Sequence, residues 1–426
     1  MPERHVQLSF DGTDYVLPVA EPTIGNPGLG IGQLRNDTGA VTFDPGFANT
    51  AGARSSITYI DGGAGVLQHR GYAIEDLAAN ASFLEVAYLL LFKKLPTRAE
   101  LDVWEDSVRH HTLLNEEMKR FFDAFPKSAH PMAILSSATN AISTFYEEFH
   151  DPTDELSFNE SALRLIAKMP TIAAWAYKKS TGMPYCYPRN DLGYVENFIH
   201  MMFHLPVQQE EVDPVLVKAL NVLLILHADH EMNCSTSTVR GVGSSRANMF
   251  TSVAAGMGAL WGPLHGGANV AVIEQLERIH SSGISVKELI ERVKRKEERL
   301  FGFGHGVYKS YDPRANILRD HAPKVLANLG RQDPLLDIAR RMEEVALSDD
   351  YFVSRNLYPN VDFYSGVLLR AMGIPVNMYT VMFAIGRMPG WIAQWKEVHD
   401  NQSRIYRPRQ VYMGSEERDY VPLRER

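Results

Sequence analysis

Three histidines and one aspartate stand in sequence settings that suit acid–base chemistry. His265 lies in WGPLHGGAN and His305 in GFGHGVY, both beside glycines, and His230 lies in HADHE after an apolar stretch. Glycine neighbours let the backbone approach a ligand closely and adopt positive φ. Asp362, in YPNVDFYSG, stands among aromatic and apolar residues, where desolvation raises a carboxyl pKa and makes a better base. Taken singly, each could be a hydrogen-bonded core or loop residue, but the cluster favours catalysis.

Three arginines lie in Pro- or Gly-containing segments and not in solvated helices. They are Arg314 in DPRA, Arg387 in GRMPG and Arg407 in YRPRQ. A guanidinium group binds a carboxylate through two parallel hydrogen bonds, so this set suits a small polycarboxylate.

Metal and nucleotide motifs are weak. His227 and His230 have an HxxH spacing, but no third metal ligand is indicated, and we predict no metal site. GLGIG at Gly28 and GFGHG at Gly302 lack the full glycine spacing and the Lys-Ser/Thr of a phosphate-binding loop, so no nucleotide-binding fold follows.

The elements that must position these residues are mostly helices. Alternating apolar residues around Asp11-Gly12 predict a small β arm in residues 1–50, and ITYIDGGAGVL predicts a second hairpin. Helix starts are predicted at Ser82 with Glu85, Thr97 with Glu100, and Ser285 with Glu288, because these spacings allow mutual capping. Asp213-Pro214 predicts the start of a buried helix. The fold class is therefore mainly α.

Composition excludes several functional classes. The chain has 426 residues, 45% hydrophobic and 22% charged, which is near the average for globular proteins. The formal charge of -8 opposes binding to nucleic acid or anionic lipid. Residues 247–273 carry no formal charge, but Pro263, His265 and the Gly266-Gly267 pair argue against a membrane span. Two cysteines and a charged N-terminus without an apolar stretch indicate the cytoplasm.

Five ordered segments resemble the citrate synthase family. GFGHGVYKSYDPR is similar to the family signature, and WGPLHGGAN, HADHE, YPNVDFYSG and RPRQVY resemble other family segments in the same order. The resemblance runs from about Thr42 to Tyr412, and the β arm is similar to that of the longer bacterial type. It implies an acyltransferase that condenses acetyl-CoA with oxaloacetate and hydrolyses citryl-CoA to citrate and CoA, the first step of the tricarboxylic acid cycle.

The resemblance also implies a domain organisation. A large helical domain would contain residues 51–268 and 372–426, and a smaller helical domain, residues 269–371, would close over the substrates. The protein would be a homodimer, or a hexamer built as a trimer of dimers. Acetyl-CoA would be a co-substrate, and no cofactor would be tightly bound.

The resemblance assigns roles residue by residue. Asp362 would be the base, His265 would stabilise the enolate and His305 would polarise the oxaloacetate ketone. Asn233 would orient His265. The carboxylates would be held by His230, Arg314, Arg387 and Arg407, the last from the partner subunit. CoA would contact Lys309 and the backbone from Gly302 to Gly304. Bacterial relatives usually carry Arg where this chain has Gly306, which bears on the nucleotide contact or on domain closure.

Some hexameric relatives are inhibited by NADH at a separate site. The segments of that site map onto Tyr146, Arg164, Lys168 and His111 here. Three other positions differ from the NADH-sensitive pattern: His110 replaces an arginine, Leu113 a methionine and Val207 a cysteine. We therefore expect NADH inhibition to be weak or absent. The alternative is that Arg164 and Lys168 face solvent or a subunit contact.

Two other functions compete with citrate synthesis. A 2-methylcitrate synthase would use propionyl-CoA with the same residues, and a pocket separates one methylene by only about 1–3 kcal/mol. A noncatalytic or metal-binding protein could also retain this fold.

Overall fold

The computed structural model describes residues 4–208, 210–330 and 332–426, which form two compact units. One unit combines the segment up to Ser55 with Tyr406–Arg426, and the other is Ser56–Ile405. In the first unit, β1 (His5–Phe10) pairs antiparallel with β2 (Thr13–Ala20), and β2 pairs with β3 (Gly28–Leu29). Helix α1 (Leu34–Thr38) follows. The hairpin predicted around Asp11-Gly12 is confirmed.

The second unit begins with a small antiparallel sheet. Its strands are β4 (Thr58–Asp61), β5 (Val66–His69) and β6 (Tyr72–Ala73). Thr58 pairs with His69 and Asp61 with Val66, as expected for a hairpin that turns at Gly62 and Gly63. The second predicted hairpin is therefore also confirmed.

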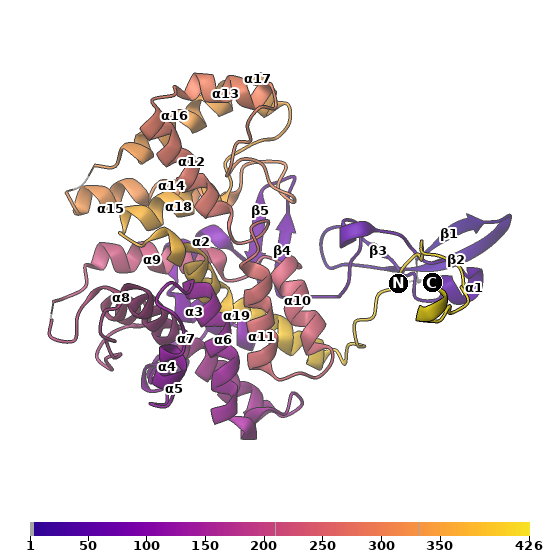
Figure 1. The fold of residues 1–426 in the computed structure, drawn as a ribbon, viewed down its shortest axis with the longest axis horizontal. Helices are drawn as coiled ribbons and strands as arrows, with labels where there is room; N and C mark the ends of the chain where they lie inside the picture. The colour runs from indigo at the N-terminus through magenta and orange to yellow at the C-terminus, as the bar shows by residue number, and fades with distance from the viewer. Residues whose placement is uncertain (1–3, 209, 331) are drawn as a thin grey trace. The chain divides into compact units, whose positions relative to one another are not determined.

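Helices make up the rest of this unit (Figure 1). The helices before the His265 loop are α2 (Ile74–Asn80), α3 (Phe83–Phe92), α4 (Arg98–His110), α5 (Met118–Asp123), α6 (Pro131–Ala141), α7 (Glu155–Thr181), α8 (Tyr194–Phe203), α9 (Pro214–His227), α10 (Cys234–Gly243) and α11 (Met249–Leu260). The helices after it are α12 (Ala268–Ser282), α13 (Val286–Lys294), α14 (Pro313–Arg319), α15 (Ala322–Asn328), α16 (Pro334–Ser348), α17 (Asp350–Val353), α18 (Val361–Ala371) and α19 (Tyr379–Asp400).

Helix α19 is the centre of the larger group of helices. It packs against α3, α6, α7, α9, α10 and α11, and nearly all of its residues up to Trp395 are buried. Figure 1 shows this helix, in yellow, running among the purple and pink helices. A helix that is apolar on all sides is stable only when neighbours cover it completely. Arg387 is therefore placed deep in the protein.

Helix α18 is the central helix among those that follow the His265 loop. It packs against α12, α14 and α15, while α16 packs against α12, α13 and α17. Helices α14 and α15 also contact α2 and α9, which join this group to the earlier helices. Asp362 is the second residue of α18.

The local capping signals are confirmed. Ser82 with Glu85 and Thr97 with Glu100 form reciprocal capping boxes at α3 and α4. The Ser285 side chain accepts from the Glu288 N–H, and the Asp213 side chain caps α9 before Pro214. These devices depend on residues at most three positions apart, which is why the sequence predicts them.

The predicted large and small domains are a finer division than the two units. The predicted boundaries after 268 and 371 fall within the second unit, and the predicted segment 372–426 is shared between both units. The division therefore stays a prediction. In the part of the chain that the structure describes, no helix has the length and apolar character needed to cross a membrane.

Candidate active site

His265 is presented by the loop between α11 and α12. The loop is closed by hydrogen bonds from Gly266 N to Leu260 O (2.9 Å) and from His265 N to Gly262 O (3.0 Å). A Cβ atom on Gly266 would lie 2.5 Å from the Leu260 carbonyl oxygen, so only glycine fits without a shift. The glycine after His265 is thus needed for the loop that aims the ring.

The first turn of α10 fixes the tautomer of His265. The Ser235 N–H donates to His265 Nε2 (3.3 Å), and the Ser235 hydroxyl lies 3.0 Å from the same nitrogen. A backbone N–H can only donate, so Nε2 is the acceptor and the neutral ring carries its proton on Nδ1. Burial, aided by the Arg387 charge, lowers the pKa of His265 to about 4. At neutral pH this histidine is an uncharged donor.

Asn233 contacts Ser235, which in turn contacts the ring of His265. Its Oδ1 accepts from Ser235 Oγ (2.8 Å) and from the Thr236 N–H that begins α10. Trp391 Nε1 also donates to Ser235 Oγ (3.1 Å). Asn233 was predicted to orient His265, and in this arrangement Ser235 makes the direct contact. Ser235 was missed because nothing in NCSTST indicates which of its hydroxyl groups faces a residue thirty positions away.

His305 has the opposite tautomer. Its Nδ1 accepts from the N–H groups of Val307 (3.0 Å) and Tyr308 (3.3 Å). The neutral ring therefore carries its proton on Nε2. Burial lowers the pKa of His305 to about 4, and Arg314 contributes in the same direction.

The glycines beside His305 tie its loop to α18. Gly302 and Gly304 have φ of +75° and +78°, which disfavours other residues. Gly304 N donates to Tyr358 O (2.8 Å), and Asn360 N donates to Gly302 O (2.9 Å). Asn360 Nδ2 also donates to Gly304 O (2.8 Å). Because Asn360 caps α18, one residue holds both the His305 loop and the helix that carries Asp362.

Asp362 is partly accessible. Burial raises the pKa of its carboxyl to about 6; Arg314 and Arg387 oppose this shift and Asp312 adds to it. A carboxylate with this pKa is ionised at neutral pH and is more basic than an ordinary aspartate. The sequence-based expectation of a desolvated carboxyl agrees with this environment.

Arg314 and Arg387 are buried cations of the same region. Arg314 donates to both oxygens of Asp312 (3.1 and 2.9 Å), and Asp312 also caps α14. Arg387 Nε donates to His227 O (2.6 Å), and burial lowers its pKa to about 10, so it stays protonated. The charge of Arg387 acts on His230, His265 and Asp362. The structure thus brings these predicted residues together.

His230 completes this group. Its Nε2 lies 3.2 Å from the Tyr308 hydroxyl, and its ring centroid lies 5.4 Å from that of His305. Burial holds its pKa well below the usual value, and Arg314 adds to the effect. A neutral His230 next to His305 suits a carboxylate or a carbonyl group as ligand.

Two predicted contacts are not brought into this cluster. Lys309 is exposed, and its backbone N–H donates to Gly62 O (2.8 Å). Arg407 is exposed in the first unit. Their roles toward CoA and the substrate carboxylate remain predictions.

The residues predicted for a nucleotide effector do come together. The Arg164 guanidinium lies 4.7 Å from the ring centroids of Tyr146 and Phe149 and pairs with Glu160. Lys168 Nζ donates to the carbonyl oxygens of His111 (2.9 Å) and Leu113 (2.5 Å). Of the alternative, exposure of Lys168 to solvent is wrong, because this residue is 5% exposed, while a subunit contact of Arg164 and Lys168 stays a prediction.

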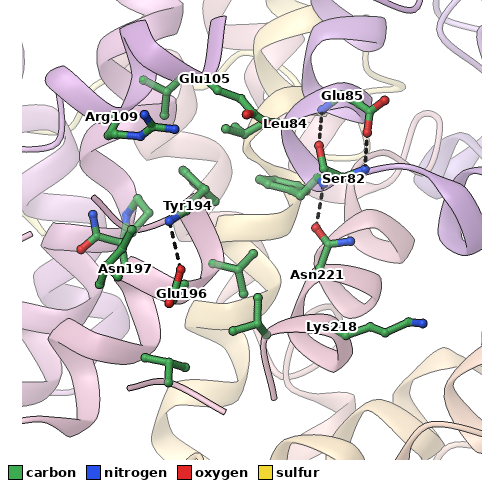
Figure 2. Close-up of a pocket in the computed structure, with 18 of the residues that line it drawn as sticks. Ser82, Leu84, Glu85, Glu105, Arg109, Tyr194, Glu196, Asn197, Lys218 and Asn221 are labelled. Carbon is green, nitrogen blue, oxygen red and sulfur yellow. Dashed lines mark hydrogen bonds between the residues drawn. The ribbon is translucent and has the colours of Figure 1, made fainter. Parts of the chain in front are cut away.

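Figure 2 shows residues that line a cavity of about 650 Å³. It is lined by residues of α3, α4, α8 and α9, among them Glu105, Arg109 and Lys218, and several of its other polar groups bond to the starts of these helices. Glu85 accepts from Ser82 N, Asn221 Oδ1 from Phe83 N (2.8 Å), and Glu196 from Gly193 N (3.2 Å). None of the predicted catalytic residues lines this cavity. Catalysis is therefore assigned to the histidine cluster and not to this space.

Within the described ranges, no group of three or more His, Cys, Asp or Glu side chains could hold a metal ion. His227 of the HxxH pair instead has Nδ1 2.7 Å from Leu223 O, an ordinary contact within a helix.

Comparison with known proteins decides the family. The family model "Citrate synthase, C-terminal domain" matches residues 46–409. The chain belongs to the citrate synthase family. Citrate synthase 1 of Mycobacterium tuberculosis is 55% identical over 419 residues, 98% of this chain and 97% of that one. The citrate synthase of Corynebacterium glutamicum is 53% identical over 423 residues, with the same coverage.

Solved structures agree with this assignment. The citrate synthase of Pyrobaculum aerophilum is 36% identical and covers all of both chains with a TM-score of 0.83. That of Thermoplasma acidophilum, solved as a ternary complex with carboxymethyl coenzyme A and oxaloacetate, is 31% identical with a TM-score of 0.83 and covers 90% of this chain and 100% of that one. The mainly α citrate synthase fold is confirmed, and the protein is an enzyme of the acyltransferase class.

Proposed function

We propose that this enzyme condenses acetyl-CoA with oxaloacetate and water to give citrate and CoA. The observation that carries the proposal is the pair of neutral histidines with opposite tautomers, His265 and His305, in one cluster with a carboxylate of raised pKa, Asp362. Each histidine is a proton donor without being a cation. Such donors stabilise negative charge that develops on two different oxygen atoms.

The first step forms the nucleophile. A thioester methyl group is a weak acid, so its proton is removed only if the enolate oxygen is stabilised at the same time. Asp362 takes this proton, and His265 Nδ1–H donates to the thioester oxygen. Ser235 N–H keeps His265 Nε2 as an acceptor, and this holds the donor proton on Nδ1.

The second step forms the carbon–carbon bond. The enol carbon attacks the ketone carbon of oxaloacetate, while His305 Nε2–H donates to the ketone oxygen and neutralises the alkoxide. Arg314, Arg387 and His230 hold the two carboxylates, and Arg407 of the partner subunit is proposed to complete this set. Water then hydrolyses the thioester of citryl-CoA, and citrate and CoA leave.

CoA binding and subunit assembly are also part of the proposed function. Lys309 and the backbone of Gly302 to Gly304 are proposed to contact CoA, with Gly306 leaving the loop without the charge that relatives carry there. A homodimer is the proposed working unit, alone or as part of a hexamer, in the cytoplasm. No tightly bound cofactor is needed for the steps above.

The acyl substrate is proposed to be acetyl-CoA and not propionyl-CoA. The relatives named above are citrate synthases, which supports this choice. One methylene changes transition-state binding by about 1–3 kcal/mol, so we expect kcat/KM for acetyl-CoA to be about ten- to two-hundredfold higher.

The test is CoA release with oxaloacetate and either acyl-CoA, with the products identified by mass. Omission of oxaloacetate is the control for simple thioester hydrolysis, and a chelator is added in parallel. A preference for propionyl-CoA would replace the proposal by 2-methylcitrate synthesis. No oxaloacetate-dependent release with either substrate would favour a noncatalytic protein.

A further inference from the structure

The turn between α9 and α10 contains a residue with a left-handed backbone. Glu231 has φ of +53°, a region that few residues other than glycine adopt. It directly follows His230 and lies two positions before Asn233, the N-cap of α10. A backbone of this kind persists only where the surrounding structure holds it in place. The groups that hold Glu231 therefore also determine how the neighbouring site residues are placed.

Asp229 is one of the groups that hold this turn. Its Oδ2 accepts from the Glu231 N–H (3.1 Å), a bond to the backbone two residues on that is typical of aspartate in turns. Asn233 adds two contacts from the other side, since its Nδ2 donates to the carbonyl oxygens of His230 (3.2 Å) and Glu231 (3.4 Å). Asp229 is fully buried and has no role in the mechanism above.

The Asp229 carboxylate is itself fixed by α19. Gln394 Nε2 lies 3.4 Å from both of its oxygens. Arg240 Nη1 donates to Gln394 Oε1 (2.7 Å), so the Gln394 amide presents its NH₂ group to Asp229. A Cβ atom on Gly390 would lie 2.6 Å from Asp229 Oδ1 and 2.2 Å from Ala228 O. Helix α19 thus lies directly against Asp229 and leaves the carboxylate little room to turn away from Glu231.

His230 is the residue that this turn places. The bond between Asp229 and Glu231 encloses His230, and the His230 carbonyl oxygen accepts from Asn233. Its ring Nε2 lies 3.2 Å from the Tyr308 hydroxyl, and its ring centroid lies 5.4 Å from that of His305. A change in the backbone of the turn would therefore move the His230 ring relative to His305.

We propose that Asp229 is a positioning residue for oxaloacetate binding, which holds the left-handed turn at Glu231 and so places the His230 ring against the substrate. The inference rests on the proposed function, because His230 is assigned there to a carboxylate of oxaloacetate. Asp229 itself touches no reacting atom in this scheme. The competing explanation is a role of its charge, since Asp229 also acts electrostatically on Arg387.

Two substitutions at Asp229 separate the hydrogen bond from the charge. Asp229→Asn removes the charge but keeps an oxygen that can accept from the Glu231 N–H, whereas Asp229→Ala removes both. We expect Asp229→Ala to raise the KM for oxaloacetate about ten- to a hundredfold, as for one lost bond to a charged group, with the KM for acetyl-CoA unchanged. Asp229→Asn should recover most of this loss. Equal losses in the two variants would show that the charge acts and would overturn the proposal.

Substitutions at Glu231 test the turn itself. The residue is exposed, so its side chain can be changed without disturbing the core. Glycine adopts positive φ without strain, so adding Glu231→Gly to Asp229→Ala should restore a large part of the lost oxaloacetate affinity. Glu231→Val keeps Asp229 but places a β-branched residue at positive φ, and it should raise the KM for oxaloacetate selectively. No recovery in the double variant would show that Asp229 does not act through the turn.

The matched control is Asp349→Ala. Asp349 also accepts from the N–H two residues on, that of Tyr351 (2.9 Å), but it caps α17. This variant should leave the KM for oxaloacetate unchanged. Thermal unfolding of each variant reports on folding. A purely structural role of Asp229 predicts that Asp229→Ala loses stability with unchanged KM values, and that result would also overturn the proposal.

If Asp229→Ala does not fold, the pair of single variants at Glu231 decides the question. Glu231→Val and Glu231→Gly both remove the same carboxylate, so they differ in what their backbone tolerates. Equal KM values for oxaloacetate in these two variants would refute the positioning role. Failure of the unaltered enzyme to release CoA would instead contradict the proposed function, so the two failures are distinguishable.

Discussion

At the scale of single residues, the candidate chemistry depends on which nitrogen of each histidine carries the proton. His265 accepts at Nε2 from a backbone N–H, and His305 accepts at Nδ1 from two backbone N–H groups. Backbone donors cannot change role with pH, so each tautomer is held as long as the ring is neutral. Both rings have pKa values of about 4 and are neutral over the working range.

Replacement of Asp362 tests the assignment of the base. Asp362→Asn keeps the shape of the side chain and removes its basicity, and general-base assistance contributes typically 10²- to 10⁴-fold. We expect turnover to fall at least about a hundredfold while oxaloacetate still binds. Steady-state kinetics and calorimetric titration with oxaloacetate measure the two quantities. Near-normal turnover would remove Asp362 from the mechanism.

The pH profile tests the same carboxyl in the unaltered enzyme. Only ionised Asp362 can accept a proton, so activity is present above its pKa and is lost as pH falls through about 6. The histidines lose their neutral form only near pH 4. We expect kcat/KM for acetyl-CoA to be level above about pH 7 and to fall about tenfold per unit below pH 6. A profile that stays level down to pH 5 would contradict the raised pKa.

Site residues can be predicted from the sequence when the residues adjacent to them in the chain are unusual. They cannot be predicted when their role depends on a contact formed only in the folded protein. His265, His305 and Asp362 stand among glycines or aromatic residues, and this context is visible in the sequence. Ser235 has ordinary neighbours. Its role comes from its contact with His265, which only the folded chain brings about.

At the scale of elements, a hairpin supports the signature loop. Lys309 N donates to Gly62 O (2.8 Å), and Ser310 Oγ lies 3.3 Å from the same oxygen. A Cβ atom on Gly62 would lie 2.1 Å from the Val307 carbonyl oxygen. The turn between β4 and β5 therefore packs directly on the segment that carries His305. The sequence predicts both pieces but not this contact, because the two lie about 245 residues apart.

Replacement of Gly62 tests this support. Gly62→Ala must push the loop of residues 305–310 away, and overpacking costs about 1–3 kcal/mol. We expect kcat/KM to fall about ten- to a hundredfold, since the ring of His305 moves with Val307 and Tyr308. Gly63→Ala is the matched control, because its Cβ would meet only Asp61 Oδ1 at 3.4 Å. Equal kinetics in the two variants would show that the hairpin does not position His305.

At the scale of the whole molecule, the residues of the candidate site come from helices that are far apart in the sequence. Asp312, Arg314 and Asp362 lie in the later helices, and Arg387 returns to the earlier group on α19. Capping residues and hydrophobic periodicity predict the helices, but they do not predict that α19 packs among the earlier helices. The division into large and small domains and the role of a partner subunit rest on the resemblance to the family and stay predictions, because capping and periodicity do not indicate which helices pack together.

Mixing inactive variants tests whether the partner subunit completes the site. Arg387→Leu and Arg407→Leu should each weaken oxaloacetate binding strongly, because a charge-assisted contact contributes about 1.5–3 kcal/mol. If Arg407 acts across a two-fold interface, each mixed dimer has one intact site, and random exchange restores about a quarter of full activity. Arg387→Leu mixed with Asp362→Asn is the control. In each site both of these residues come from the same subunit, so a mixed dimer has no intact site and should stay inactive. No recovery after confirmed exchange would place Arg407 elsewhere.

The predicted effector cluster consists of Tyr146, Arg164, Lys168 and His111. Its cationic side chains, Arg164 and Lys168, already have partners within the chain. Lys168 is committed to two backbone carbonyl groups, and burial lowers its pKa to about 8. Arg164 lies against the rings of Tyr146 and Phe149 and pairs with Glu160. His110, where the family resemblance predicts that an arginine contact is lost, has Nδ1 3.3 Å from Asp106 Oδ1. An incoming phosphate would have to displace Glu160 and would meet Asp106.

NADH should therefore inhibit this enzyme weakly or not at all. The loss of one charge-assisted contact corresponds to about ten- to a hundredfold in affinity, and the commitment of Arg164 and Lys168 to contacts within the chain acts in the same direction. The measurement is CoA release at low salt and subsaturating acetyl-CoA, with NADH added stepwise. A series at saturating acetyl-CoA is the control, because it removes simple competition at the CoA site. Half-inhibition at micromolar NADH that persists at saturating acetyl-CoA would show that the cluster binds the nucleotide despite its internal contacts.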